Sequence, residues 1–187
     1  VMNGFRAELI NKIVGFNSHI SVKPYENKII ISENLKSKLS FISKNLVFSN
    51  SSEAIIINND NSKGVILRGY LANDFPNLEI FKNDNLLGNI KIRKNEISIG
   101  KELSFNLNLN LGDNITIMSS SGIETIIGNL PKYQTFIISS IFESGLAEFD
   151  NNIIFLNLKT LEEFSNLSEK DRNLEVYLKK PQNIFPK

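Results

Sequence analysis

The stretch from Asn114 to Phe142 decides the fold and reads NITIMSSSGIETIIGNLPKYQTFIISSIF. Its two ends, Asn114–Met118 and Tyr133–Phe142, are rich in β-branched and aromatic residues, which is typical of strands. The segment between them, Ser119–Tyr133, is longer than a hairpin turn, which takes about 2–5 residues. It is also partly apolar, because it contains Ile123, Ile126, Ile127 and Leu130. The sequence therefore predicts two neighbouring strands with a long, partly apolar loop between them.

This loop allows two arrangements. In the first it protrudes, and Pro131 restricts the backbone near its far base. Exposed aliphatic side chains then carry an aggregation risk unless another molecule binds them. In the second arrangement the same side chains fold back onto the body as an ordinary packed loop. The residues alone leave both arrangements open.

Hydrophobic periodicity outlines the first half of the chain. It predicts an amphipathic helix from Val1 to Phe16 and a second helix that begins after Ser32 or Asn34 and continues to about Lys44. The predicted strands are His19–Val22, Lys28–Ile31, Leu46–Phe48, Ala54–Ile57 and Gly64–Tyr70. A polar turn at Asn50–Ser52 is expected to separate the third of these strands from the fourth.

One segment in the second half of the chain fits both a strand and a helix. Residues 103–111 alternate strictly between leucine or phenylalanine and polar residues, which favours a strand, yet Ile99, Leu103 and Leu107 are four apart, as in a helix. Residues 71–95 are loop-like, and the remaining predicted strands are Glu96–Ile99, Ile153–Leu156 and Leu174–Leu178. A helix over Leu158–Phe164 is predicted with Asn157 as its N-cap.

Composition excludes several classes of function. The 187 residues include 21 Lys and Arg against 20 Asp and Glu, so no basic footprint for nucleic acid is present. Cysteine is absent and histidine occurs once, which excludes disulfides, thiolate catalysis and a histidine metal cluster. No apolar run approaches the length of a membrane helix. The missing initiator Met suggests a piece of a longer protein, and the soluble part of a membrane protein is one such piece.

Candidate catalytic residues are few. His19 lies in an apolar strand pattern, where a hydrogen-bonded structural histidine is the better interpretation. Glu143, Glu148 and Asp150 cluster around Gly145 and could form an acid/base pair or a metal site, but a solvated turn joining two strands is favoured. We therefore predict no catalytic residue, no metal and no cofactor.

Several short motifs resemble, in their order, the lipoprotein-releasing ABC transporter permeases of the LolC/LolE type. They are Val1–Phe5, Gly15–Phe16 with His19–Val22, Gly64–Gly69, Ile99–Leu103, Leu111–Asp113, Phe142-x-x-Gly145-x-x-Glu148-Phe149-Asp150 and Phe155–Leu158. Each motif is weak alone, but their shared order across nearly the whole chain is specific. The resemblance implies the periplasmic domain that lies between the first two membrane helices of such a permease.

The family's fold is α+β. The resemblance implies a mixed α/β, porter-like subdomain formed by both chain ends, residues 1–66 and 151–187, with an inserted β-rich subdomain, residues 67–150, that carries a protruding hairpin. The family domain continues beyond this C-terminus, so part of the first subdomain is expected to be missing. The resemblance also resolves the conflict between periods in favour of a short helix over Lys101–Leu107.

The resemblance gives the loop a function. In the family, a hairpin called the hook projects here and inserts into a periplasmic lipoprotein carrier of the LolA type. Thr125-x-x-Gly128-x-x-Pro131 matches the hook's pattern, except that Ile126 stands where the best-known members have proline. The expected partner-binding residues are Thr125, Ile126, Ile127, Gly128, Asn129, Leu130, Pro131, Lys132 and Tyr133. The family's basic pad falls on Thr116, Tyr133 and Gln134, none of them basic, and Lys132 is the only nearby cation.

The implied protein is a non-catalytic permease subunit of the inner membrane with this domain in the periplasm. Its expected partners are the carrier, the lipoprotein substrate, a second permease subunit and a separate cytoplasmic ATPase subunit. The main alternative is a related permease of the cell-division signalling or macrolide-efflux type, which would bind another soluble protein. An enzyme using Glu143, Glu148 and Asp150 is the alternative from a different class.

Overall fold

The computed structural model describes residues 17–23, 33–58, 61–82, 86–126 and 128–179, without the side chains of residues 33–36, 123–125 and 129. The predicted helix Val1–Phe16 and the predicted strand Lys28–Ile31 lie outside this part of the chain. The strands are β1 (Ile20–Val22), β2 (Ser43–Asn58), β3 (Asn61–Tyr70), β4 (Leu87–Gly88), β5 (Glu96–Gly100), β6 (Asn114–Ser119), β7 (Ile123–Thr125), β8 (Gly128–Leu130), β9 (Tyr133–Phe142), β10 (Ile153–Asn157) and β11 (Asn173–Leu178). The helices are α2 (Glu33–Ile42), α3 (Lys101–Leu107), α4 (Ala147–Asn152) and α5 (Leu158–Ser165), with three short 3₁₀ segments, η1 (Phe75–Asn77), η2 (Glu79–Phe81) and η3 (Glu169–Asp171).

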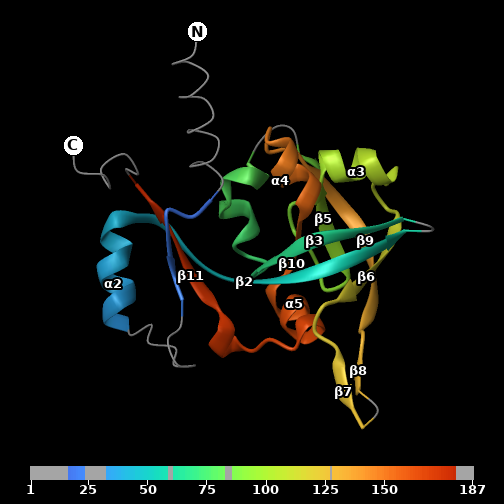
Figure 1. The fold of residues 1–187 in the computed structure, drawn as a ribbon. Coiled ribbons are helices and arrows are strands. Elements are labelled where there is room, and N and C mark those ends of the chain that lie inside the picture. The colour runs from blue at the N-terminus through green and yellow to red at the C-terminus, as the bar shows by residue number, and fades with distance from the viewer. Residues whose placement is uncertain (1–16, 24–32, 59–60, 83–85, 127, 180–187) are drawn as a thin grey trace.

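One large mixed sheet organises the molecule, in the order β1-β11-β2-β3-β10-β5-β9-β4, and β6 pairs with both β2 and β9 (Figure 1). Because β6 joins β2 to β9, the pairings of β2, β3, β10, β5, β9 and β6 close into a ring. The β10–β3 and β5–β9 pairs are parallel, and the other pairs of the ring are antiparallel. The predicted mixture of helices with a β-rich body is confirmed.

The ring encloses an apolar core because alternate side chains of its strands face inward. The core includes Ile56, Leu67, Ile99, Ile117, Phe136 and Leu156, each fully buried. Two helices contribute to the same core, α3 through Leu103 and α5 through Leu161 and Phe164. These contacts hold α3 and α5 against the ring, on different sides of it (Figure 1).

A second core, rich in aromatic side chains, covers the outer face of the β10 side of the ring. Phe81, Phe142 and Phe155 pack edge to face, with ring centroids 5.0–6.4 Å apart. Phe81 belongs to η2, in the segment that the sequence predicts to be loop-like, and its burial fastens that segment to the sheet. β10 lies between the two cores, so all four apolar residues of Ile153–Leu156 are buried. A continuous apolar run of this kind is expected of a strand covered on both faces.

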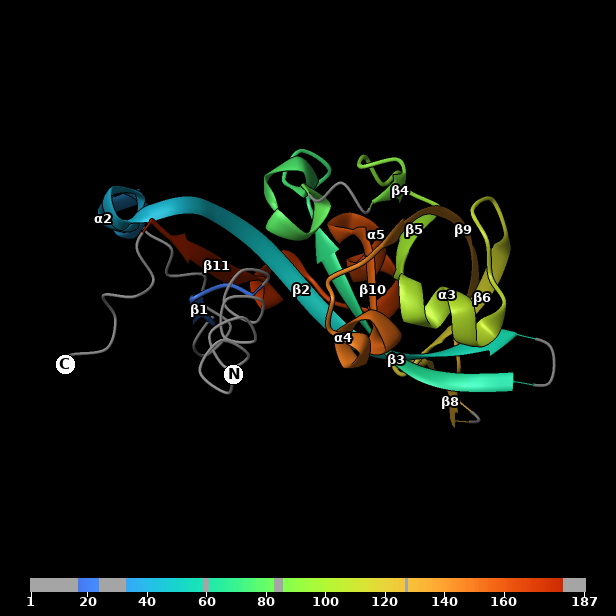
Figure 2. The same ribbon diagram turned by 90° about the horizontal axis from the view of Figure 1, so that it is seen from above.

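The long strand β2 shows one sequence prediction to be wrong. Leu46–Phe48 and Ala54–Ile57 belong to a single strand that pairs with β3 from Ser49 to Asn58 without a break. Asn50 of the expected turn and Ser49 just before it bond to distant partners: Asn50 Nδ2 donates to Glu162 Oε1 at 3.0 Å and Ser49 Oγ to Glu175 Oε1 at 2.7 Å. Near this point β2 leaves β11 and joins β6, and it curves visibly in Figure 2.

Helix α3 confirms the prediction that rested on the resemblance. It spans Lys101–Leu107, and Asn108 ends it in the left-handed conformation with φ of 51°. Leu103 is fully buried whereas Phe105 is 81% exposed, so the alternating pattern does not correspond to two sheet faces. The leucines are spaced both as in a strand and as in a helix, so the pattern fits either structure. The packing of Leu103 into the core of the ring favours the helix.

The division into two subdomains remains a prediction. Its expected boundary at residues 66 and 67 lies inside β3, whose pairing with β2 and β10 continues across that point. The predicted elements over Glu96–Ile99, Asn114–Met118, Tyr133–Phe142, Ile153–Leu156, Leu158–Phe164 and Leu174–Leu178 are confirmed as β5, β6, β9, β10, α5 and β11. Asn157 caps α5 as expected, with its side chain accepting from Lys159 N at 3.0 Å.

Candidate functional site

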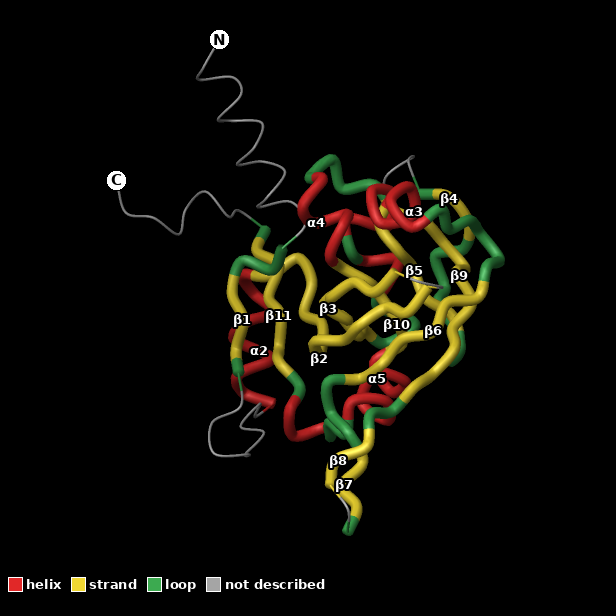
Figure 3. Tube along the Cα trace, turned by 45° about the vertical axis from the view of Figure 1, so that its right-hand side comes forward, coloured by secondary structure: helices red, strands yellow, loops and turns green. Residues whose placement is uncertain are grey.

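The long loop between β6 and β9 is a hairpin that forms its own two-stranded sheet. β7 pairs with β8 in antiparallel register, from Ile123 opposite Leu130 to Thr125 opposite Gly128. This small sheet is separate from the main sheet. Figures 1 and 3 show it projecting away from the body beyond α5. Of the two arrangements that the sequence allows, the structure has the protruding one.

The end of the hairpin presents apolar side chains to solvent. Ile126 is fully exposed, at 106% of its reference area, and Leu130 is 49% exposed. Pro131 is exposed at the base of β8, and Tyr133, the first residue of β9, is 54% exposed. Ile127 and the side chains of Thr125 and Asn129 lie outside the described part, and Gly128 has φ of +119°, a conformation that favours glycine. The predicted partner-binding residues that the structure describes thus run along the hairpin from Thr125 to its base, where Tyr133 begins β9 of the main sheet.

Lys132 does not extend toward the tip. Its Nζ donates to the main-chain carbonyl of Glu163, in the last turn of α5. The predicted cation beside the hook is therefore bound to the body, where it faces the C-terminal end of a helix.

The positions that correspond to the family's basic pad carry no charged side chain. Thr116 and Thr135 lie opposite each other in β6 and β9, with their hydroxyls 3.1 Å apart. Tyr133 lies opposite Met118 in the same pair of strands, and Gln134 opposite Ile117. The outward face next to the hairpin therefore offers the hydroxyl groups of Thr135 and Tyr133 where a basic pad would offer charge, while Gln134 lies opposite the buried Ile117.

The three clustered carboxylates each engage a partner within the chain. Glu143 forms an ion pair with Lys101 at 3.0 Å, and Glu148 Oε1 accepts from Asn152 Nδ2 at 3.3 Å. Asp150 is 2% exposed and accepts from Ser144 N at 3.0 and 3.1 Å, while burial raises the pKa of its carboxyl. The expectation of a solvated turn is wrong here, because this segment contains α4. Within α4, Asp150 is buried and its carboxylate accepts from the main chain of the loop before the helix.

His19 is hydrogen-bonded within the fold, as predicted. Its Nδ1 accepts from Leu178 N at 3.1 Å, and its ring meets that of Tyr177 edge to face at 6.2 Å. Burial lowers its pKa. Among the residues that the structure describes, no group of three or more His, Asp or Glu is placed to hold a metal ion. Within the same residues, no helix is long and apolar enough to cross a membrane.

A buried polar network that the sequence prediction missed ties β11 to β2 and β3. Glu175 is 5% exposed and accepts from Arg68 Nη2 at 3.1 Å and Ser49 Oγ at 2.7 Å. The hydroxyls of Tyr70 and Tyr177 donate to the same carboxylate, each at 3.0 Å. Burial is the main cause that raises the pKa of both tyrosines, so both remain donors at neutral pH. The one sequence signal was an acidic residue between Leu174 and Val176 in a strand pattern.

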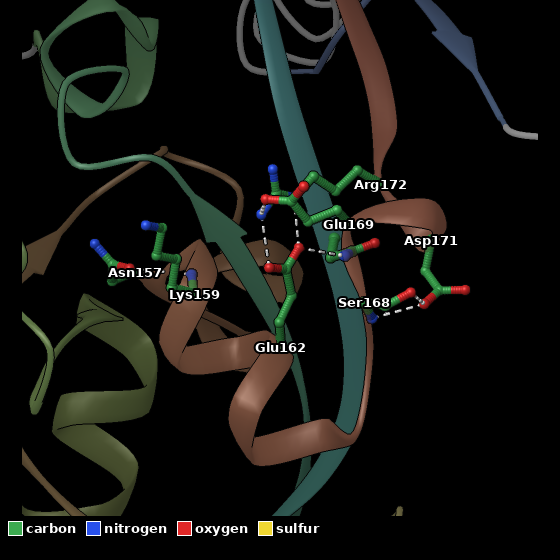
Figure 4. A network of polar contacts seen from close by, with 8 residues as sticks. Asn157, Lys159, Glu162, Ser168, Glu169, Asp171 and Arg172 are labelled. Atoms are coloured by element: carbon green, nitrogen blue, oxygen red, sulfur yellow. Dashed lines mark hydrogen bonds and ion pairs between the residues drawn. The ribbon is translucent and has the colours of Figure 1, made fainter. Parts of the chain in front are cut away.

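Helix α5 carries a second network, drawn in Figure 4. Arg172 Nε donates to Glu162 Oε1 at 2.6 Å and Arg172 Nη2 to Glu162 Oε2 at 2.8 Å. This bidentate pair is mostly shielded from solvent, and Asn50 of β2 donates to the same carboxylate. Glu162 therefore fixes α5 against β2 and against the segment that leads into β11.

No protein-family model matches the chain. Curated relatives include the lipoprotein-releasing system transmembrane protein LolC of Xylella fastidiosa strain Temecula1, 21% identical over 180 residues that cover 89% of this chain and 41% of the relative. The protein of the same name from Neisseria meningitidis serogroup B is 22% identical over 196 residues, covering 98% of this chain and 45% of the relative. The chain thus spans less than half the length of these relatives.

Solved structures with the same fold include the extracellular domain of the noncanonic ABC-type transporter YknZ from Gram-positive bacteria, with a TM-score of 0.50 and 13% identity over 86% of this chain and 84% of that one. The periplasmic region of MacB from Actinobacillus actinomycetemcomitans also has a TM-score of 0.50, with 12% identity over 95% of this chain and 82% of that one. The resemblance drawn from the motifs is confirmed: the chain is similar along most of its length to LolC-type lipoprotein-releasing permeases and has the periplasmic-domain fold of ABC-type permeases.

Proposed function

We propose that this domain belongs to an inner-membrane permease that releases lipoproteins, and that its β7–β8 hairpin binds a periplasmic lipoprotein carrier of the LolA type. The observation that carries the proposal is a separate two-stranded hairpin with a fully exposed isoleucine, Ile126, on a chain similar to LolC. A soluble domain gains nothing in its own stability from an apolar side chain in water. A partner that covers this side chain would gain the free energy of burying it.

The chemistry of the partner supports the same proposal. A carrier of acylated proteins needs an apolar cavity, and a narrow hairpin with apolar residues at its tip fits the mouth of such a cavity. Among the described strands, β7 and β8 pair with each other in a sheet of their own. The edges of such a sheet can add backbone hydrogen bonds to a partner strand.

A binding measurement with the carrier protein of the same organism tests the proposal. We expect the wild-type domain to bind and Ile126→Asp to abolish binding, because a carboxylate cannot enter an apolar cavity without a large desolvation cost. Phe105→Asp is the matched control, since Phe105 is 81% exposed but lies on α3, away from the hairpin. Both variants should keep the wild-type melting temperature. Unchanged carrier binding by the Ile126 variant would refute the hook assignment.

The remaining parts of the system follow from the same proposal. The domain is non-catalytic and lies in the periplasm, while a second permease subunit and a separate cytoplasmic ATPase complete the complex. The domain holds the carrier through the hairpin and helps to transfer the lipoprotein substrate to it. Capture of the cognate ATPase subunit by the full-length permease, and its absence with the isolated domain, would support this division of labour.

The second candidate is a related permease that binds a different soluble partner, of the cell-division signalling or macrolide-efflux type. The fold shared with the periplasmic region of MacB and the extracellular domain of YknZ favours it. The uncharged residues Thr116, Tyr133 and Gln134 also favour it, because the family's basic pad is missing at these positions. Absence of carrier binding by the wild-type domain would select this candidate.

A further inference from the structure

Both legs of the hairpin are attached to the C-terminal end of α5. On the leg before β7, Ser121 Oγ donates to the carbonyl of Ser165 at 2.8 Å. The carbonyl of Gly122, on the same leg, accepts from Asn166 Nδ2 at 3.0 Å. On the leg after β8, Lys132 Nζ donates to the carbonyl of Glu163. The two legs also bond to each other, through Ser119 N and the carbonyl of Lys132 at 2.8 Å.

These contacts serve the helix as well as the hairpin. The last carbonyls of a helix have no partner within the helix, and a cation near them is favourable. Ser121 and Lys132 supply the missing partners for Ser165 and Glu163. Asn166 ends α5 in the left-handed conformation, with φ of 54°, which directs its side chain to the hairpin leg.

Helix α5 is itself fixed to the body. Leu161 and Phe164 are fully buried in the core of the ring, and Phe164 meets Phe136 of β9 edge to face at 5.8 Å. The bidentate Arg172–Glu162 pair and the bond from Asn50 hold the outer side of the helix. A hairpin attached to α5 on both legs therefore cannot swing without breaking contacts to a rigid element.

We propose that Ser121, Lys132 and Asn166 are positioning residues that set the direction in which the hairpin leaves the body. They hold Ile126 in one place relative to the ring, so that a partner meets a preorganised tip. The consequence for carrier binding rests on the proposed function, whereas the fixed direction of the hairpin is a property of the isolated domain.

The fixed direction is measurable without any partner. The chain contains no cysteine, so Ile126→Cys and Phe105→Cys provide two unique sites for spin labels, one on the hairpin and one on α3. We expect a narrow distance distribution in this labelled parent. The distance distribution should broaden in a variant that combines Ser121→Ala, Lys132→Met and Asn166→Gly, because this variant lacks all three side-chain bonds between the legs and the end of α5. The glycine keeps the left-handed backbone at position 166.

Matched single variants separate positioning from general destabilisation. Lys94 Nζ binds the side chain of Glu163 at 3.0 Å, whereas Lys132 Nζ binds its main-chain carbonyl. We expect Lys132→Met to broaden the distance distribution and Lys94→Met to leave it as narrow as in the labelled parent. Lys132→Arg, which keeps a cation at this position, should also leave the distribution narrow. An unchanged distribution in the combined variant would overturn the proposal, even if carrier binding is observed.

Carrier affinity gives the second readout. If the released hairpin spends one-tenth of its time in the binding direction, the apparent affinity should fall about tenfold, with Ile126 still present. A broadened distribution with unchanged affinity would overturn the link between direction and binding. Failure of the wild-type domain to bind the carrier would refute the proposed function, while the distance measurement would still decide whether the three residues position the hairpin.

Discussion

The six-stranded ring and the hairpin are built from the same kind of sequence, yet they bury their apolar residues differently. In the ring, Ile56, Ile99 and Phe136 are fully buried between strands and helices. In the hairpin, Ile126 is fully exposed and Leu130 is about half exposed. Free energy of folding comes from buried apolar area, so the ring carries the stability of the domain and the hairpin contributes little. A change deep in the body or at the tip of the hairpin should therefore leave the property of the other region intact, whereas a change at α5, which contacts both, should affect both.

The largest expected effect is on the stability of the body. Phe142→Ala removes a fully buried ring that contacts Phe81, Phe149 and Phe155, and should lower the free energy of unfolding by about 3–5 kcal/mol. Urea unfolding followed by circular dichroism measures the change. The folded fraction should still bind the carrier like wild type, because the hairpin is untouched. A loss below about 1 kcal/mol would show that this core collapses around the cavity.

A smaller effect is expected where α5 meets β3. A Cβ at Gly69 would lie 2.9 Å from Leu161 Cδ2 and 3.0 Å from Leu158 Cα, so Gly69→Ala must shift the Leu161 side chain and press on the backbone of α5, and it should cost about 1–3 kcal/mol. Gly64→Ala in the same strand is the control, since nothing lies within 4 Å of its added Cβ. Because α5 also holds the hairpin, Gly69→Ala should broaden the hairpin's distance distribution. An equal effect of both substitutions on stability would contradict this account.

Acidification should lower the free energy of unfolding by about 0.5–1.5 kcal/mol, which is the contribution of one hydrogen bond. His19 Nδ1 accepts from Leu178 N, and protonation of the ring removes that acceptor. Burial lowers the pKa of His19 below its usual 6.5, so the unfolded chain binds the proton first. This contribution to stability is complete above pH 6.5 and is lost as the pH falls through the folded pKa.

Thermal melts between pH 7.5 and pH 5 test this expectation with His19→Asn as the control. The Asn side chain keeps an oxygen acceptor but does not titrate. The difference in melting temperature between wild type and this variant should therefore shrink as the pH falls. If this difference stays constant across the range, the pKa of His19 does not differ between the folded and unfolded states, and the expectation is wrong.

The smallest effect on stability is expected at the tip of the hairpin. Ile126→Ala removes apolar atoms that are already in water, so the free energy of unfolding should change by no more than about 0.5 kcal/mol. Carrier binding should nevertheless weaken, which is the converse of the result expected for Phe142→Ala. Urea unfolding and carrier titration of the same sample measure both. If Ile126→Ala lowered the free energy of unfolding about as much as Phe142→Ala, the hairpin would contribute to stability like the body, and the distinction between the two regions would be wrong.

The sequence predicted some elements well because their signals are local. The β-branched and aromatic residues of Tyr133–Phe142 and the continuous apolar run in Ile153–Leu156 are typical of strands within each segment itself. Asn157 caps α5 through a bond that spans two residues. The presence of a long, partly apolar insertion between two strands was also recognisable, although the residues left open whether it protrudes or packs back onto the body.

Other features depended on contacts that local patterns do not contain. Asn50 looks like a turn residue, but Glu162, 112 residues away, accepts its bond and keeps β2 continuous. Ser121 and Asn166 look like ordinary loop residues, although each forms a bond across 44 positions that fixes the hairpin to α5. No periodicity of the sequence could have revealed these pairs.

The sequence by itself determined the β-rich composition of the body, its apolar faces and the presence of an apolar insertion. These follow from side-chain hydrophobicity at short spacing, which each segment carries alone. Only the tertiary structure decided that β6 closes the ring, that Leu103 packs into its core and that the insertion stands away from the body. Those outcomes depend on which distant surfaces meet, and the free energy of such contacts exists only once the whole chain has folded.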